Sequence, residues 1–563
     1  MSASVESGPW NPGIESQVPK ELLHLSTIFR PENVYTSIDA AAELHDLTGI
    51  AMSELAVFRP QRLALHELLL RITADFAVPD GTRIEDLGLN FREMARLVLS
   101  RYLEADMNAI VGAYQRARRE MAAIMGTALD ALRRDWGPKE IAQLERPGAA
   151  PGDGARAIAH KSLARVLSGL FGAQGQAWGT RQLIASIATD LACNDFGSDC
   201  VGAAIEPILR RAAQNEGYRL LPRQEHPIVI NTKGPSASGK STLRPLQKKL
   251  AGDIGIDWSD FALISPDIWR KQLLDYSALG AAYKYAGAFT SEELQIVDQK
   301  LDRYMARKYQ RGDMTHLLID RFRFDSFAPD SLEAGSNLLT RFGQSAYLFF
   351  MITPPQQLVE RAWKRGLEVG RYKAVDDTLA HAVEAYSGIP DVFFTWVRRS
   401  DKRIQFEFLD NSVQFGERPR TVAFGDNETF NVLDVKGTLD IERFARVSIE
   451  APSAECLYAD RALLGPAQNT AFLRRCIEGF RRVNFAEQAS GRVYLSIETG
   501  VPILKDPAAL RAAAMDPDTL AGIRLAAPDA TRGAVPDVES AVYLRGAGGS
   551  ATLPTLGQWG GLT

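Results

Sequence analysis

The sequence predicts an α/β fold, in which a parallel sheet covered by helices follows an α-helical domain and precedes a small α+β appendage. The first reason is a series of five short apolar segments, separated by stretches with helical spacing. Such alternation is typical of a parallel sheet with helices on both faces. The second reason is a glycine-rich loop between the first apolar segment and a helix. The third is the helical recurrence of apolar residues from about 18 to 146.

The strands expected in this sheet are the apolar segments themselves. They are IVIN at 228–231, FALIS at 261–265, HLLID at 316–320, AYLFFMI at 346–352 and IQFEFLD at 404–410. Beyond about residue 415 the pattern is mixed, with strand candidates TVAF and FNVLDV and a helical run near 467–485. This mixture predicts the α+β appendage.

The chain of 563 residues is longer than one hydrophobic core usually serves, so several domains are expected. The segment PGAAPGDG at 147–154 is unfavourable for helix and strand and marks a boundary near residue 150. The end of the chain is rich in Gly and Pro, which predicts a flexible tail. The expected regions are an α-helical domain with a flexible N-terminal arm at 1–150, a helical connector at 151–223, the domain with the sheet at 224–425, the appendage at 426–525 and the tail at 526–563.

Charge and composition narrow the expected partners and location. The net charge of −4 gives no overall attraction to nucleic acid or to an anionic membrane. No basic leader and no apolar run near 20 residues is found, so we expect a cytoplasmic protein, or one delivered into another cell by a secretion machine. The four cysteines are widely spaced and predict free thiols without zinc. His66 is interpreted as a buried core histidine, and the cluster Arg116, Arg118 and Arg119 as a solvated helix face.

The glycine-rich loop carries the strongest functional signal. Residues 234–241, GPSASGKS, fit the pattern G-x-x-x-x-G-K-[ST], with a strand before and a helix after. Backbone amides of such a loop converge on a phosphate, Lys240 would reach the β- and γ-phosphates, and Ser241 would ligate Mg²⁺. The alternative is a Gly/Ser-rich turn with a chance lysine. The residues expected to bind ATP are Gly234, Pro235, Ser236, Ala237, Ser238, Gly239, Lys240, Ser241 and Thr242, with Arg361 and Arg371.

The second strand supplies a candidate base. FALIS runs into Ser265 and Pro266, which suit a helix start and place Asp267 in the first turn. Asp267 and Arg270 are three residues apart and share a helix face. A carboxylate at the carboxyl end of a strand can accept the proton of an attacking hydroxyl, while Arg270 binds an anionic part of the acceptor. The alternative is an Asp that only complements the helix dipole.

The third strand ends in another carboxylate. HLLID places Asp320 where such residues act on Mg²⁺ or on its water, so Ser241 and Asp320 are the expected metal ligands. Arg321 and Arg323 are expected to face the acceptor, although surface pairing with Asp325 is an alternative. Neither arginine is expected to be catalytic.

A cationic helix follows the fourth strand. Arg361, Lys364 and Arg365 recur at helical spacing and Arg371 lies beyond a glycine. This helix could close over the triphosphate and neutralise charge during transfer, with Arg365 as a catalytic residue. The alternative is a solvated helix balanced by acidic neighbours.

Taken together, the loop at 234–241, Asp267-x-x-Arg270, the arginine-bearing lid and the strand ending in Asp410-Asn411-Ser412 resemble the zeta-toxin group of P-loop kinases, over about residues 224–425. The resemblance implies that Asp267 is the base and that Lys240 and Ser241 bind phosphate and Mg²⁺. Members of this group phosphorylate UDP-N-acetylglucosamine, and related effector kinases phosphorylate NAD. A toxin or effector role would imply an antitoxin or a host protein as partner. The insert around Tyr283 departs from a minimal kinase.

We therefore expect a Mg²⁺-dependent kinase that transfers the γ-phosphate of ATP to a hydroxyl of a nucleotide-containing small molecule. One alternative is a polynucleotide 5′-kinase, with Arg116 to Arg119 presented to RNA. Another is an ATP-gated protein-interaction module that needs no phosphate transfer. No membrane partner is expected and nucleic acid is an unlikely ligand.

Overall fold

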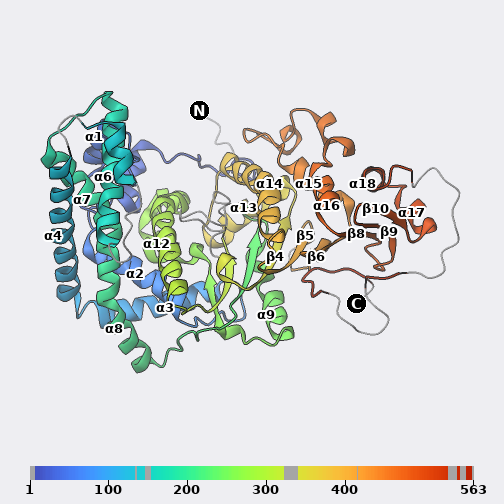
Figure 1. Ribbon diagram of the computed structural model, residues 1–563, viewed down its shortest axis with the longest axis horizontal. Coiled ribbons are helices and arrows are strands. Elements are labelled where there is room, and N and C mark those ends of the chain that lie inside the picture. The colour runs from blue at the N-terminus through green and yellow to red at the C-terminus, as the bar shows by residue number, and fades with distance from the viewer. Residues whose placement is uncertain are drawn as a thin grey trace. The chain divides into compact units, whose positions relative to one another are not determined.

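A computed structural model of the chain describes residues 7–132, 136–145, 154–321, 340–414, 416–529, 542–544 and 553–560. The chain divides into two compact units, and each contains segments that are distant in the sequence. The helical unit consists of residues 17–220 and 266–304, and the sheet unit of residues 1–16, 221–265 and 305–563 (Figure 1).

The helical unit is built from long helices around a buried central one. Its helices are α1 Ile38–Thr48, α2 Pro60–Asp75, α3 Asp86–Val98, α4 Met107–Ala131, α5 Pro138–Glu145, α6 Gly154–Gln174, α7 Arg181–Ala192, α8 Ser198–Glu216, α10 Arg270–Leu273, α11 Ala286–Phe289 and α12 Ser291–Gln310, the last continuing beyond the unit. Helix α2 is buried on nearly every side, and its buried residues include the charged Glu67 and Arg71. A helix buried all round belongs to the interior of a domain, so α2 forms the centre of this unit.

The sheet unit contains one ten-stranded sheet with the order β10-β9-β8-β7-β6-β5-β4-β1-β3-β2. Its strands are β1 Ile228–Lys233, β2 Phe261–Ile264, β3 His316–Asp320, β4 Ser345–Ile352, β5 Arg403–Asp410, β6 Arg420–Asp426, β7 Thr429–Val432, β8 Arg482–Ala486, β9 Val493–Glu498 and β10 Val501–Leu504. The pairings among β2, β3, β1, β4 and β5 are all parallel. The mixed α/β class and the five strands expected from the apolar segments are thereby confirmed.

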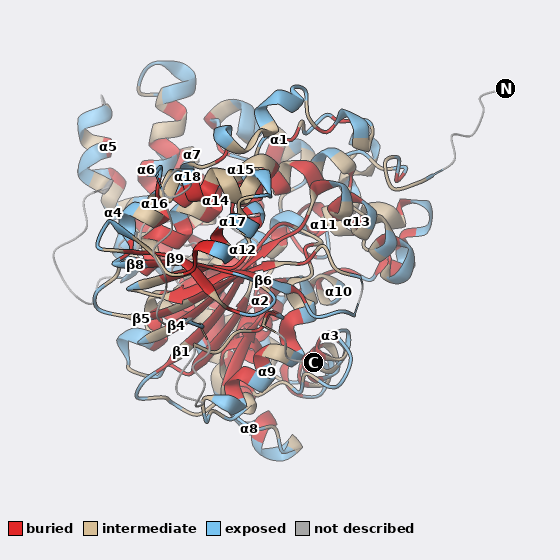
Figure 2. Cartoon of the chain, turned by 90° about the vertical axis from the view of Figure 1, so that its right-hand side faces the viewer, coloured by how far each residue is buried: buried red, intermediate tan, exposed pale blue. Residues whose placement is uncertain are grey.

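Helices cover the central strands, whose residues are mostly buried (Figure 2). The helices of this unit are α9 Arg244–Asp253, α13 Pro355–Val369, α14 Val375–Val397, α15 Val435–Phe444, α16 Ala471–Gly479, α17 Pro507–Ala513 and α18 Pro517–Ala526. Phe393 of α14 lies at the middle of an aromatic cluster and contacts Phe350, Phe406 and Phe408 of β4 and β5. Buried aromatic pairs of this kind add to the area that they remove from water.

Two expected boundaries differ from the observed arrangement. Helices on both sides of residue 150 belong to the same unit, because α6 packs against α4, α5 and α7. Residues 426–525 contain the expected mixture of helix and strand, but their strands continue the main sheet, since β7 pairs with β6 and β8 with β7. The helical run expected near 467–485 ends at Gly479, and β8 follows it.

The expectation of a flexible tail at 526–563 is wrong for residues 553–560. Trp559 is buried and packs on Phe424 of β6, with ring centroids 5.0 Å apart. The backbone amides of Leu556 and Gly557 donate to the buried carboxylate of Glu407, at 2.6 and 2.9 Å. The buried side chains of Leu556 and Trp559 and the hydrogen bonds to Glu407 therefore offset the ordering entropy that the Gly-rich composition implies. In the N-terminal arm, Trp10 likewise packs on a buried cluster of the sheet unit.

Candidate functional site

The loop at 234–239 has an unusual backbone conformation. It leaves β1 at Lys233 and leads into a short 3-10 helix, Lys240–Leu243, that continues as α9. Gly234, Ala237 and Gly239 have φ angles of 155°, 64° and 90°. Ala237 is one of two non-glycine residues with positive φ in the described part of the chain. Strained backbone of this kind clusters at ligand-binding turns, where alternating conformations aim successive amides at an anion.

Both motif glycines are required by close packing as well as by φ. A Cβ on Gly234 would lie 2.7 Å from the Cβ of Met351, and one on Gly239 would lie 2.3 Å from Nδ2 of Asn411. Any larger side chain would therefore displace the end of β4 or the residue after β5. The two glycines hold the loop tightly against the carboxyl ends of these strands.

The loop's polar side chains bond within the site. Lys240 Nζ donates to the carbonyls of Gly234 and Pro235, at 3.1 and 3.0 Å, so the lysine lies along the loop. Ser241 Oγ donates to Oδ2 of Asp320 at 2.7 Å. A hydroxyl and a carboxylate at this separation can share a hard cation such as Mg²⁺, which takes oxygen ligands and completes its shell with phosphate and water.

The sheet order places this loop where ligands bind in open α/β folds. β1 lies between β3 and β4, and Thr232 of β1 is directly opposite Asp320 of β3. Strands β2 and β3, which follow β1 in the chain, lie on one side of β1 in the sheet. The next strand, β4, lies on the other side of β1. The order reverses beside β1, and in open α/β sheets ligands bind at the carboxyl ends of the strands beside such a reversal.

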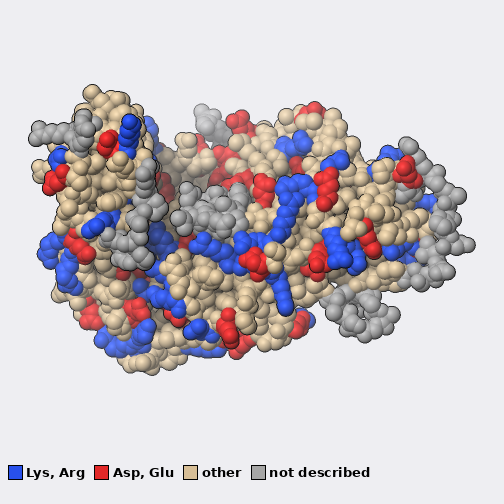
Figure 3. Space-filling model, in the orientation of Figure 1, with Lys and Arg blue, Asp and Glu red and all other residues tan. Residues whose placement is uncertain are grey.

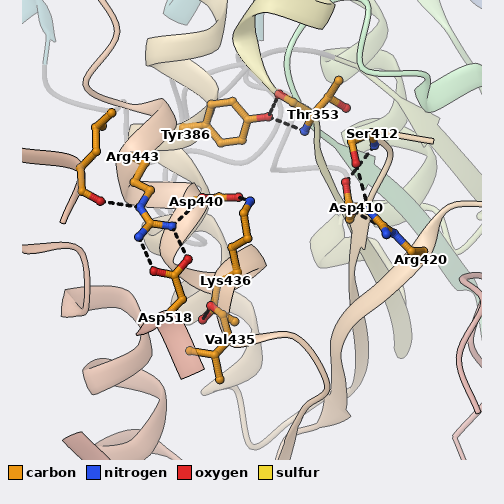
Figure 4. Close-up of polar contacts among 12 residues, drawn as sticks. Thr353, Tyr386, Asp410, Ser412, Arg420, Val435, Lys436, Asp440, Arg443 and Asp518 are labelled. Atoms are coloured by element: carbon orange, nitrogen blue, oxygen red, sulfur yellow. Dashed lines mark hydrogen bonds and ion pairs between the residues drawn. The ribbon is translucent and has the colours of Figure 1, made fainter. Parts of the chain in front are cut away.

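Residues behind the loop hold one of its peptides in place. The carbonyl of Ser238 accepts a hydrogen bond from Asn411 Nδ2 at 2.7 Å and a longer one from Thr353 Oγ1 at 3.4 Å. Thr353 is itself fixed by Tyr386, whose hydroxyl accepts from the Thr353 amide and donates to its carbonyl, both at 2.7 Å (Figure 4). Burial raises the pKa of Tyr386, so its hydroxyl keeps the proton that it donates. The sequence interpretation missed this support.

The arginine-bearing helix α13 is connected to the same place. Arg361 donates to the carbonyls of Asn411 and Val413, at 2.7 and 3.1 Å. Burial lowers the pKa of its guanidinium, and the nearby Asp410 opposes this shift. Asp410 also forms an ion pair with Arg420 of β6 at the end of β5 (Figure 4). Arg361 thus holds the segment that supports the loop. The sequence pattern predicts that Arg361 binds ATP and does not predict this structural role.

The other expected ligands on this side differ in their surroundings. Lys364 Nζ lies 3.8 Å from Oε1 of Glu368 on the exposed face of α13. This ion pair agrees with the alternative of a solvated helix balanced by acidic neighbours. Arg365 and Arg371 are partly buried, and Thr242 donates its hydroxyl to the carbonyl of Gly239. Arg321, expected to face the acceptor, is 2% exposed. Arg323 and Asp325 lie outside the described residues.

Asp267 and Arg270 belong to the helical unit. Asp267 is in a 3-10 helix, Pro266–Trp269, three residues after β2 ends at Ile264. Its carboxylate accepts a hydrogen bond from Arg270 Nε at 2.9 Å. Arg270 also donates to the carbonyl of Gly287 and to the hydroxyl of Thr290. The arginine therefore organises its own segment and orients Asp267, in addition to any contact with an acceptor.

Other polar residues noted in the sequence have structural partners. His66 is fully buried, as expected, and burial together with Lys300 lowers its pKa to about 3. Arg118 forms an ion pair with Asp190 of α7. On the face drawn in Figure 3, basic and acidic side chains are interspersed. Within the described ranges, no group of three or more His, Cys, Asp or Glu could hold a metal ion.

No helix among the described residues is long and apolar enough to cross a membrane. Comparisons with protein-family models, curated proteins and solved structures each found no match to this chain.

Proposed function

We propose that the chain is a Mg²⁺-dependent kinase that transfers the γ-phosphate of ATP to a hydroxyl of a nucleotide-containing small molecule. The observation that carries the proposal is the 2.7 Å contact between Ser241 and Asp320, at the ends of a glycine-rich loop and of the strand beside it. Phosphate-binding loops join a hydroxyl and a strand-end carboxylate in this way to hold the metal of MgATP.

Each element of the loop has a role in this reaction. The amides of 234–239 would bind the β- and γ-phosphates, and Lys240 would exchange its two carbonyl acceptors for phosphate oxygens when ATP binds. Ser241 and Asp320 would hold Mg²⁺ directly or through its water. Arg365 and Arg371 would contribute positive charge as the phosphoryl group moves.

The transfer step needs a base and an in-line acceptor. The acceptor hydroxyl oxygen forms a bond to the γ-phosphorus, the bond from this phosphorus to the β–γ bridging oxygen breaks, and ADP leaves with its electron pair. Asp267 takes the hydroxyl proton. The zeta-toxin resemblance favours UDP-N-acetylglucosamine or NAD as acceptors, each with several ribose or sugar hydroxyls, and a toxin or effector role with them.

The first experiment is a transfer assay with γ-labelled ATP and Mg²⁺ against UDP-N-acetylglucosamine, NAD, nucleosides and RNA 5′-ends. Wild type is compared with Asp267→Asn for chemistry and with Lys240→Met for ATP binding. We expect label on one nucleotide-type acceptor, loss of transfer with retained ATP binding in Asp267→Asn, and loss of both in Lys240→Met. ATP binding without transfer to any acceptor would contradict the kinase and favour an ATP-gated interaction module. Label on RNA alone would favour the polynucleotide kinase.

A further inference from the structure

The segment that carries the proposed base is part of the helical unit. Residues 266–304 leave the sheet after β2 and fold together with residues 17–220. Three contacts within this unit hold the start of the segment against other elements, and two of them come from helix α2.

The first contact is made by Trp269, two residues after Asp267. Its side chain is fully buried, and its indole N–H donates to Oγ1 of Thr73 on α2 at 3.1 Å. Thr73 is 3% exposed and donates its own proton to the carbonyl of Leu69, at 2.8 Å. The threonine hydroxyl is therefore oriented by its helix, with a lone pair directed at the indole.

The second contact is made by Arg62, which lies about three turns before Thr73 on the same side of α2. It donates to the carbonyl of Leu273, where α10 ends, at 2.7 Å. It also forms a two-point ion pair with Glu293 of α12, at 2.5 and 2.6 Å. Glu293 is fully buried and Arg62 lowers its pKa although burial acts in the opposite sense. Residues 266–273 are thus tied to α2 at their middle, through Trp269, and at their end, through the carbonyl of Leu273.

The third contact fixes Asp267 itself. Arg270 bonds to Asp267 Oδ1 with one edge of its guanidinium and to the Gly287 carbonyl with another nitrogen. Phe289, two residues further on, accepts a hydrogen bond at its carbonyl from Thr27 at 3.1 Å. Asp267 therefore has one preferred orientation, set by groups that α2 and the N-terminal segment support.

A buried polar network continues from Glu293 into the interior. His66 donates to Glu293 and accepts from Lys300, and Lys300 also bonds to Ser198, which donates to Glu67. A serine, a lysine and a histidine in sequence could suggest a hydrolytic site, but all are at most 3% exposed. The network instead fixes the position of α12 against α2 and α8, since a buried charge is stable only with its partners in place.

From these contacts we propose that α2 is the positioning element for Asp267, with Thr73 and Arg62 as positioning residues. The inference rests on the proposed kinase function for its catalytic consequence. It assigns residues 17–220 the role of a rigid support for the acceptor side of the reaction, in place of an independent partner-binding domain. A support of this kind matters because a shift of about 1 Å in a catalytic group can reduce a rate by about a hundredfold.

The test compares Thr73→Val with Thr73→Ser and with the control Thr48→Val. Thr48 is as buried as Thr73, donates to a carbonyl four residues back, Leu44, and accepts from an N–H, that of Ile50. Both valine variants thus lose the same kinds of bonds in the same unit, but only Thr73 bonds to Trp269. Two readouts are used, which are hydrogen exchange of residues 266–276 and the transfer rate with saturating ATP.

We expect Thr73→Val to speed exchange of 266–276 and to lower kcat, each by about tenfold, the effect of about 1.4 kcal/mol. The KM for ATP should stay within about twofold, Thr73→Ser should restore both readouts, and Thr48→Val should change neither. Equal effects in the two valine variants, or unchanged exchange in Thr73→Val, would overturn the inference. If wild type transfers no phosphate, the proposed function fails, whereas the exchange result still decides whether α2 holds this segment.

Discussion

Replacing Asn411 tests how the loop is held in its binding conformation. Asn411→Ala removes the Nδ2–H that donates to the Ser238 carbonyl at 2.7 Å. Both groups are buried, and the only other donor recorded for this carbonyl in the described chain is Thr353 at 3.4 Å. The variant leaves the loop's own sequence intact, so any change in nucleotide binding must come from its support.

The expected magnitude follows from the cost of an unsatisfied buried acceptor, about 1–3 kcal/mol. Thr353 can approach and recover part of this cost, so we expect a loss of about 1–2 kcal/mol in ATP binding. This is about a 5- to 30-fold increase in Kd. The larger part should appear in binding because ATP requires one orientation of the Ser238–Gly239 peptide, whereas the empty loop can relax.

The assay is titration calorimetry with ATP and Mg²⁺, with thermal unfolding measured in parallel. Asn427→Ala is the control, because Asn427 also donates to backbone carbonyls, of Val397 and Arg399, at the opposite end of β5. The control should lower the unfolding temperature by a similar amount and leave Kd unchanged. An unchanged Kd in Asn411→Ala, or equal changes in both variants, would refute the reasoning.

Three further changes have definite expectations. Gly239→Ala should weaken ATP binding more than Asn411→Ala does, because a Cβ at this position would lie 2.3 Å from Nδ2 of Asn411 and alanine at positive φ costs about 1–2 kcal/mol. Titration calorimetry measures the affinity, and a Kd equal to that of wild type would contradict this prediction. Asp320→Asn should reduce the affinity for MgATP about tenfold while ATP alone binds as in wild type. The amide oxygen can still accept from Ser241, but the side chain no longer carries the negative charge that binds Mg²⁺. Equal losses of affinity with and without Mg²⁺ would exclude a role in metal binding. Burial raises the pKa of Glu407 to about 7 from an ordinary value of 4.5, so its contribution is complete below pH 4.5 and is lost as the pH rises through 7. In denaturant unfolding, wild type should therefore lose up to about 3 kcal/mol between pH 4.5 and 8 relative to Glu407→Gln, and parallel pH profiles would contradict this.

The central strands and the loop could be predicted because their signals are local. Each of the five parallel strands is a continuous apolar segment, and buried parallel strands need no information from distant residues. The adjacency of Ser241 and Asp320 follows from the order of strands once a parallel sheet is assumed. That the loop binds ATP stays a prediction.

The remaining features depend on contacts between residues far apart in the chain. Nothing near Trp559 indicates that Phe424 will bury it, and nothing near Asn411 indicates a bond to Ser238. The continuation of the sheet through β6 to β10 also depends on pairing partners, because the same alternation suits a separate small sheet. Arg361 illustrates a further limit, since spacing gives its helix face but not whether a carbonyl or a phosphate is its acceptor.

The interleaved order of the two units has a consequence for how the protein is made. The helical unit lacks the part of its residues 266–304 that contacts α2 through Trp269 and Glu293 until this segment has been synthesised. The sheet unit receives its last strand only at residues 501–504. The helical unit therefore cannot be completed during translation before the first strands of the sheet unit, at residues 221–265, have been made, whereas contiguous domains can be completed in turn. A nascent chain that ends between 221 and 268 exposes the side of α2 that Trp269 and α12 later cover. Such chains are natural clients for chaperones, and conditions that slow elongation across this interval should reduce the yield of folded protein.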